Sequence, residues 1–212
     1  MRKMLLSLAA VAGVAVMVSG FAVAGDKYGK EGKDKTAHAE HAVAKVGAPA
    51  PLFSLQDQTG KSVNLADFKD KIVVLEWFNE DCPICARHYQ AGSMQALANE
   101  MTGKGVVWLA VNSTKNKDNA SNQKIAGEWK MNFPILNDAT GEVGHLYGAK
   151  TTPHMYVINN GVLAYAGAID DDPQGKGAKV NYVKKAVEEI MAGQSVTTPE
   201  TKPYGCSVKY AK

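Results

Sequence analysis

The chain has 212 residues, of which 45% are hydrophobic and 21% charged, a composition that excludes a disordered, fibrous or polytopic membrane protein. The formal net charge is +3, which is too small to support nucleic-acid binding by electrostatic attraction. The three cysteines are too few for a disulfide scaffold, so we expect them to be reactive residues.

The first 24 residues have the order of a secretory signal peptide. Arg2 and Lys3 give a positive start, residues 4–18 are almost wholly apolar, and Ala22-Val23-Ala24 supplies an A-x-A cleavage site. An uncleaved membrane anchor is the alternative, because the apolar stretch approaches the roughly 20 residues that span a bilayer. We expect cleavage after Ala24 and a periplasmic or secreted protein that keeps no stable membrane span.

A polar segment separates this signal peptide from the folded part of the chain. Residues 25–45 are rich in Lys, Gly, Ala, Asp and Glu without apolar periodicity, which predicts a flexible linker. Residues 46–195 are expected to form one domain and residues 196–212 a C-terminal tail that carries Cys206. Export would place the thiols where disulfides persist, and an odd number of cysteines leaves one over for chemistry.

The pattern of the domain is that of an α/β protein. Apolar runs at residues 72–78 and 106–111 are nearly continuous, which predicts strands buried on both faces of a sheet. The other expected elements are a hairpin at 52–65, helices at 86–101 and 119–130, a short strand at 133–136, an Asn-Gly hairpin at 155–168 and a helix at 180–191. This alternation predicts a mostly parallel sheet flanked by helices.

A Cys-x-x-Cys motif, Cys82-Pro83-Ile84-Cys85, lies between the strand at 72–78 and a helix that begins at Pro83. The dipole and free N–H groups of a helix N-terminus favour the thiolate of Cys82, which is therefore the predicted nucleophile. Cys85, one turn further into the helix and more shielded, is the predicted resolving thiol. The same spacing is half of a zinc site, but no second pair completes one.

An acid interrupts the apolar strand before the motif. Glu76 lies six residues before Cys82, and the alternation of side chains along a strand points it into the interior beside Cys85. Burial raises the pKa of a carboxylic acid, so Glu76 is expected to accept the Cys85 proton during resolution, directly or through water. The alternative is a carboxylate that turns to solvent at the strand end.

Several stretches together carry a family resemblance. They are Leu75–Cys85 around the motif, Gly148–Pro153 before the second hairpin, Val46–Phe53 at the start of the domain, and Pro203–Tyr210 in the tail. They resemble the active site, the cis-proline loop, the domain start and the tail of exported redoxin-domain and peroxiredoxin-like proteins of the thioredoxin-like superfamily. The resemblance covers about residues 46–193.

The resemblance implies a thioredoxin-like fold with a central mixed sheet flanked by helices and an N-terminal hairpin extension. It also implies a thiol-disulfide oxidoreductase that acts on protein cysteines and is recharged by a membrane or periplasmic thiol donor. No organic cofactor is expected, because the dithiol itself carries the electrons. The resemblance further implies that Pro153 is cis and that the backbone of Thr152 pairs with an extended substrate segment.

Two other functions stay open. Peroxiredoxins place a Thr or Ser three residues before the reactive cysteine and a Pro four residues before that, whereas this chain has Asn79 and Leu75 there. A specialised thiol peroxidase is therefore disfavoured, although an exposed low-pKa thiolate would still reduce peroxide slowly.

The second alternative is a copper- or zinc-delivery protein of the same fold. Its ligands would be Cys82, Cys85, His88, which follows on the same helix face, and His154, which follows the predicted cis-proline. Copper or zinc is expected only under this alternative.

The remaining site predictions concern the tail and the surroundings of the motif. Cys206 could contact an oxidised Cys82 as a third redox thiol, pack as a half-buried residue, or pair between chains, and we expect the redox contact. Arg87 is expected either in solvent or bent toward Cys82, where its charge would lower the thiolate pKa. Tyr89 is expected to be a core residue, and the acidic run 170–172 a surface feature that caps the following helix.

Overall fold

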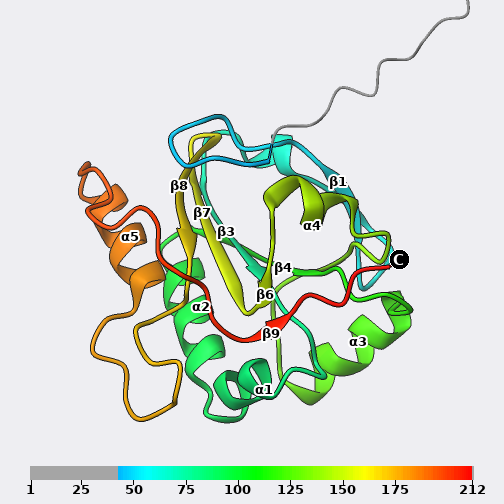
Figure 1. Ribbon diagram of the computed structural model, residues 1–212. Helices are drawn as coiled ribbons and strands as arrows, with labels where there is room; N and C mark the ends of the chain where they lie inside the picture. Colours follow the sequence, from blue (N-terminus) through cyan, green and yellow to red (C-terminus); the bar gives the residue numbers. More distant parts are fainter. Residues whose placement is uncertain (1–42, 212) are drawn as a thin grey trace, which may run out of the picture. The chain divides into compact units, whose positions relative to one another are not determined.

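A seven-stranded mixed β-sheet organises residues 43–211, the part of the chain that the computed structural model describes (Figure 1). Its strands, in spatial order, are β2 (Ser62–Asn64), β1 (Ser54–Asp57), β5 (Ile135–Asn137), β4 (Val107–Asn112), β3 (Ile72–Trp77), β7 (His154–Asn159) and β8 (Val162–Gly167). Strand β4 pairs in parallel with β3 and β5, and the other neighbours in the sheet are antiparallel.

Helices pack against the sheet and form two separate apolar cores with it. One core contains residues of the helices α1 (Pro83–Gln90), α2 (Ser93–Gly103), α3 (Asn119–Glu128) and α5 (Tyr182–Met191). The other contains residues of the short helix α4 (Glu142–Tyr147) and the 3₁₀-helix η1 (Leu65–Phe68). The central mixed sheet flanked by helices agrees with the predicted fold class. The mostly parallel sheet predicted from the alternation of strands and helices is wrong, because only the two pairs made by β4 are parallel and the two hairpins add antiparallel strands at the sheet edges.

Alternation along β3 divides its side chains between these two cores. Val74 belongs to the core with α1 and α2, whereas Val73, Leu75 and Trp77 belong to the core with α4. Because both faces of β3 are covered, the strand reads in the sequence as a continuous apolar run. Glu76 follows the parity of Val74 and therefore lies on the face that α1 covers.

Two of the predicted elements differ from the structure, and one helix of the structure was not predicted. The helix predicted at 86–101 is broken, since α1 ends at Gln90 and α2 begins at Ser93. Gly92 between them has φ 74°, a left-handed conformation that glycine adopts without steric cost and that interrupts the helical hydrogen-bond series. Strand β5 begins two residues later and ends one residue later than the strand predicted at 133–136. The helix α4 was not predicted.

The C-terminal tail crosses the molecule from the end of α5 and forms a second, two-stranded sheet (Figure 1). In this sheet β6 (Thr151–Thr152) pairs with β9 (Cys206–Ser207). Before β9, the N–H of Thr201 donates to the carbonyl of Ala166 at 3.1 Å, and after β9 the N–H of Val208 donates to the carbonyl of Lys150 at 3.2 Å. The tail is therefore part of the folded domain.

The predicted signal peptide (1–24) and most of the predicted linker (25–45) lie outside the described residues. The last linker residues differ from the prediction, because the N–H of Ala44 donates to the carbonyl of Leu146 at 2.9 Å and so anchors the chain before residue 46. No helix between residues 43 and 211 has the length and apolar character that crossing a membrane requires.

Candidate active site

The two cysteines of the motif lie at the start of α1, as the sequence predicts. Cys82 is the N-cap of the helix, with φ −89° and ψ 117°, and Pro83 is its first residue. The carbonyl of Cys82 accepts a hydrogen bond from the N–H of Ala86 at 2.9 Å, which closes the first turn. Cys85 is one turn further along and fully buried, and Cys82 is only 2% exposed.

The two thiols differ strongly in acidity. The pKa of Cys82 is lowered from 9.0 to about 4, chiefly because the Cys85 thiol donates a hydrogen bond to its sulfur, and the side chains of Thr152 and Cys206 add further hydrogen bonds. Burial raises the pKa of Cys85 well above its usual range, and its contact with the charged Cys82 raises it further. Cys82 is therefore a thiolate and Cys85 a thiol near neutral pH.

This difference predicts an acidic titration of the reduced protein. The rate at which iodoacetamide alkylates Cys82 should follow a midpoint near pH 4, far below the value of about 8.5 for a free cysteine. Because the folded-state pKa is depressed, the Cys82 thiolate stabilises the fold above the unfolded pKa, and this stabilisation is lost as the pH falls toward 4. The ultraviolet absorbance of the thiolate should titrate with the same midpoint and vanish in Cys82→Ser. A midpoint above about pH 7 would contradict the assignment.

Glu76 is fully buried beside α1, where the sequence places it. The hydroxyl of Tyr89 donates to its Oε1 at 2.8 Å, and the indole N–H of Trp108 donates to its Oε2 at 3.1 Å. Burial raises the pKa of Glu76 to about 7, although both hydrogen bonds oppose that shift. The charge of Glu76 in turn helps to raise the pKa of Cys85. Tyr89, predicted only to fill the core, thus also holds the acid in place.

The loop before β7 places the backbone of Thr152 and Pro153 beside Cys82. The Thr152–Pro153 peptide bond is cis, as the resemblance implies. The carbonyl of Thr152 lies 3.0 Å from the sulfur of Cys82 and accepts its hydrogen bond when that thiol is protonated. The backbone of Thr152 pairs with Cys206 of the tail, so a strand of the same chain occupies the position expected for a substrate segment.

Cys206 lies against the same sulfur. Its thiol makes a hydrogen bond with Cys82, and its pKa is raised by burial and then by this contact. Residues 43–211 therefore bring three thiols together at the start of α1, and the redox role of Cys206 stays a prediction.

The two histidines of the metal-delivery alternative have other partners. The ring nitrogens of His88 lie 3.2 Å from the hydroxyls of Ser93 and Tyr204. His154 lies 3.0 Å from the hydroxyl of Tyr156, and burial lowers its pKa to about 3. Between residues 43 and 211 no group of three or more His, Cys, Asp or Glu side chains is placed to hold a metal ion. The structure does not assemble the predicted ligand set.

Arg87 takes neither of its predicted positions. Its guanidinium donates to the carbonyls of Asp172 and Pro173 at 3.0 and 3.1 Å. Arg87 therefore holds the loop that precedes α5 and does not bend toward Cys82, because backbone carbonyls within reach of its five donors satisfy it.

The acidic run 170–172 differs from the prediction at Asp170 and in the helix cap, whereas Asp171 is exposed as predicted. Asp170 is buried and accepts a hydrogen bond from the hydroxyl of Tyr204 at 2.5 Å. The N-cap of α5 is Asn181, whose side chain accepts from the N–H of Lys184 at 2.8 Å. The run therefore anchors the tail and the loop, and it does not cap the helix.

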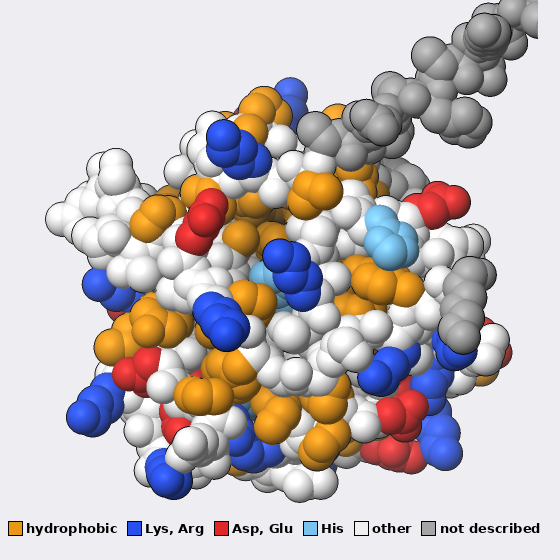
Figure 2. Space-filling view, in the orientation of Figure 1, with side chains coloured by type: hydrophobic (Ala, Val, Ile, Leu, Met, Phe, Trp, Pro, Cys, Tyr) orange, Lys and Arg blue, Asp and Glu red, His pale blue; other side chains and the backbone are white. Residues whose placement is uncertain are grey.

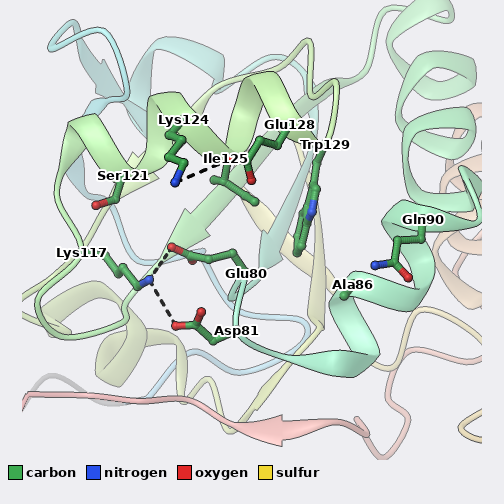
Figure 3. Close-up of a pocket in the computed structure, with 10 residues that line it drawn as sticks. All are labelled: Glu80, Asp81, Ala86, Gln90, Lys117, Ser121, Lys124, Ile125, Glu128 and Trp129. Atoms are coloured by element: carbon green, nitrogen blue, oxygen red, sulfur yellow. Dashed lines mark ion pairs between the residues drawn. The ribbon is translucent and has the colours of Figure 1, made fainter.

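A charged groove of about 430 Å³ lies between α1 and α3 (Figure 3). Lys117 bridges two acids there, at 2.8 Å from Glu80 and 3.2 Å from Asp81. None of the three cysteines lines this groove. The reactive sulfur is therefore outside the charged groove.

On the face that the tail crosses, hydrophobic side chains are interspersed with single Lys and Arg residues, and acidic side chains gather with basic ones over α3 (Figure 2).

Comparison with known proteins assigns the chain to a family. Residues 46–166, more than half of the chain, match the model of the AhpC/TSA family. The chain belongs to the AhpC/TSA family. This assignment agrees with the resemblance of the sequence to redoxin-domain and peroxiredoxin-like proteins.

Curated relatives of this AhpC/TSA protein carry two kinds of name. The thiol-disulfide oxidoreductase ResA of Halalkalibacterium halodurans is 31% identical over 57% of this chain and 66% of its own length. A Mycobacterium tuberculosis protein named as a peroxiredoxin is 27% identical over 68% of this chain and 88% of its own. The chain thus spans about two thirds of the length of the ResA relatives.

Solved structures support the same fold for this AhpC/TSA protein. An uncharacterized conserved protein from Geobacillus kaustophilus superposes with a TM-score of 0.73 at 28% identity, covering 80% of this chain and 94% of the other. The thioredoxin domain of a thiol-disulfide oxidoreductase from Bacteroides vulgatus superposes with a TM-score of 0.50 at 22% identity, covering 57% and 87%. The predicted thioredoxin-like fold is confirmed.

Proposed function

We propose that this AhpC/TSA protein is a thiol-disulfide oxidoreductase that exchanges disulfides with the cysteines of other proteins. The observation that carries the proposal is the difference in acidity between Cys82 and Cys85 at the start of α1. One thiol is ionised and attacks, and the other stays protonated until it resolves. The name of the ResA relatives supports the same activity.

The reaction needs two exchanges. The Cys82 thiolate attacks one sulfur of a substrate disulfide, forms a mixed disulfide and releases the first substrate thiolate. Cys85 then gives its proton to Glu76 and attacks the Cys82 sulfur, which releases the second substrate thiolate and leaves a Cys82–Cys85 disulfide. Glu76 is suited to this step because its pKa of about 7 lets it hold or release a proton near neutral pH.

The remaining predictions about the cellular setting belong to the same proposal. The signal-like residues 1–24 support a periplasmic or secreted protein. A thiol protein there would restore the reduced pair, and the dithiol carries the electrons without an organic cofactor. Thr152 and Pro153 would position the substrate segment beside Cys82.

Thiol peroxidase activity is the second candidate, supported by the family match and by the relative named as a peroxiredoxin. The side chain that would have to assist a peroxide is Asn79, three residues before Cys82. Its Oδ1 already accepts a hydrogen bond from the N–H of Asp81 at 2.8 Å. Disulfide exchange is therefore the better supported of the two activities.

A trapping experiment tests the proposal. The double variant Cys85→Ser/Cys206→Ser keeps the attacking thiol and lacks both thiols that could resolve the adduct, so it should accumulate mixed disulfides with oxidised protein substrates. Peptide mapping by mass spectrometry should place every adduct on Cys82. The matched variant Cys82→Ser/Cys206→Ser should accumulate none. Equal adduct yields in the two variants would contradict the assigned roles.

A further inference from the structure

The attacking sulfur is covered by the protein's own tail. Cys82 is 2% exposed, although a thiol that exchanges disulfides with other proteins has to be reached by them. Strand β9 lies over it, with Ser207 opposite Thr151 and Cys206 opposite Thr152 in antiparallel register. Figure 1 shows β9 beside β6, the strand with which it pairs. The edge of β6 beside Cys82 is therefore filled.

The tail is closely fitted to this edge at the residue before Cys206. Gly205 has φ 128°, and a Cβ built on it would lie 2.1 Å from the carbonyl oxygen of Thr152 and 3.3 Å from the ring of Pro153. No other residue could occupy this position without displacing the backbone on one side. The close approach of Gly205 brings Cys206 into register with Thr152.

Side chains on both sides of Cys206 hold the segment down. The hydroxyl of Tyr204 donates to Asp170 at 2.5 Å and lies 3.2 Å from Nε2 of His88. At the other end, the hydroxyl of Tyr210 donates to the carbonyl of Ala149 at 2.7 Å. Backbone hydrogen bonds hold the middle of the segment, through the short pairing of β9 with β6 and through the carbonyl of Lys209, which accepts from the N–H of Lys115 at 2.8 Å. A segment this short can open locally without unfolding the domain.

We propose that the tail segment Tyr204–Tyr210 is an internal pseudosubstrate. It occupies the β6 edge as an extended external polypeptide would, and it has to leave before a protein substrate can reach Cys82. In the oxidised protein, Cys206 can replace Cys85 as the disulfide partner of Cys82. The exclusion of external substrates rests on the proposed function. The docking of the tail and the exchange between the three cysteines do not, because they involve this chain alone.

The internal exchange balances without an added oxidant. The Cys206 thiol loses its proton and its sulfur attacks the Cys82 sulfur of the Cys82–Cys85 disulfide. The Cys82–Cys206 bond forms, the Cys82–Cys85 bond breaks, and Cys85 leaves as a thiolate that takes up one proton. The number of disulfides is unchanged, so the step only moves the oxidised bond toward the more exposed thiol.

Two glycine variants test the docking. Gly205→Ala should expel the tail, whereas Gly127→Ala in α3 is a matched control because a Cβ there meets no atom within 4 Å. In the reduced full chain, a maleimide should alkylate Cys82 roughly ten-fold faster in Gly205→Ala than in wild type, as expected when a few hydrogen bonds no longer close the site. Gly127→Ala should react at the wild-type rate. Equal rates in the two variants would overturn the proposal.

A milder variant guards against a misfolded Gly205→Ala protein. Tyr204→Phe removes the hydrogen bond to Asp170 without adding atoms, so it should raise the alkylation rate of Cys82 by a smaller factor. A wild-type alkylation rate in Tyr204→Phe would contradict the pseudosubstrate role.

Disulfide mapping tests the internal exchange. After equilibration with glutathione disulfide, wild-type protein should contain both the Cys82–Cys85 and the Cys82–Cys206 links, and Gly205→Ala only the first. Absence of the Cys82–Cys206 link from wild type would overturn this part. Neither the mapping nor the alkylation uses a protein substrate. A failure of the proposed exchange activity would therefore leave both readouts intact.

Discussion

Cys82→Ser is expected to abolish disulfide exchange, with a rate loss of about 10³-fold or more, as is usual when an enzyme loses its nucleophile. Cys82 is the one cysteine of the chain whose pKa is lowered, whereas the pKa values of Cys85 and Cys206 are raised. A serine hydroxyl at the N-cap of α1 keeps the local structure but cannot attack a disulfide. The measurement is the initial rate at which the pre-reduced protein reduces a model protein disulfide.

Cys206→Ser is the matched control for this loss. It removes a thiol from the same site by the same substitution, and it leaves the Cys82–Cys85 pair intact. We expect it to retain exchange at a rate within about a factor of three of wild type, because serine replaces cysteine with little change in volume. Near wild-type activity in Cys82→Ser, or an equal loss in both variants, would mean that another group is the nucleophile.

Glu76→Gln is expected to slow the second exchange by about 10²-fold, the usual contribution of a positioned acid or base. Glutamine keeps the shape of Glu76 but cannot take the proton that Cys85 has to lose. The first attack does not use this proton, so the alkylation rate of Cys82 should be unchanged. Single-turnover measurement of the mixed-disulfide lifetime separates the two steps. A slower first attack with normal resolution would assign Glu76 a structural role only.

The same substitution has a signature in stability. In the oxidised protein Cys82 does not titrate, and the pKa of buried Glu76 is raised from 4.5 to about 7. The folded state therefore prefers the protonated acid. The contribution of Glu76 to the free energy of unfolding is fully present below pH 4.5 and is lost as the pH rises through 7. The free energy of unfolding should fall by about 3 kcal/mol over this range. Denaturant unfolding of oxidised Glu76→Gln should lack this decline. An identical decline in both proteins would contradict the raised pKa.

The elements that the sequence predicts well are those whose signals are local. Strand β3 is an unbroken apolar run because both faces of it are buried, and the turn of the β7–β8 hairpin has positive φ at Asn160 and Gly161. Helix α4 was missed for the opposite reason. It has only six residues, and the packing of Val143 and Tyr147 in the second core stabilises it rather than helical periodicity.

The same distinction applies to the active site. The strand–helix junction was enough to predict the positions of Cys82, Cys85 and Glu76. The donors to Glu76 depend on tertiary contacts, since Trp108 reaches it from the neighbouring strand β4. The pairing of Thr152 with Cys206 joins residues far apart in the chain through strands of two residues each. Strands that short carry no periodicity, so only the structure reveals that the tail covers the nucleophile.

The reduction potential of the Cys206→Ser protein tests the central claim most directly. This variant keeps only Cys82 and Cys85, and the protein would be equilibrated in glutathione buffers before its free thiols are trapped and mapped by mass spectrometry. We predict a single two-electron transition in which both cysteines are oxidised together into one disulfide, between about −270 and −120 mV, the range of thioredoxin-like dithiols. If the two cysteines stay separately alkylatable across that range, with no disulfide between them, the pair does not carry electrons and the proposed function is wrong.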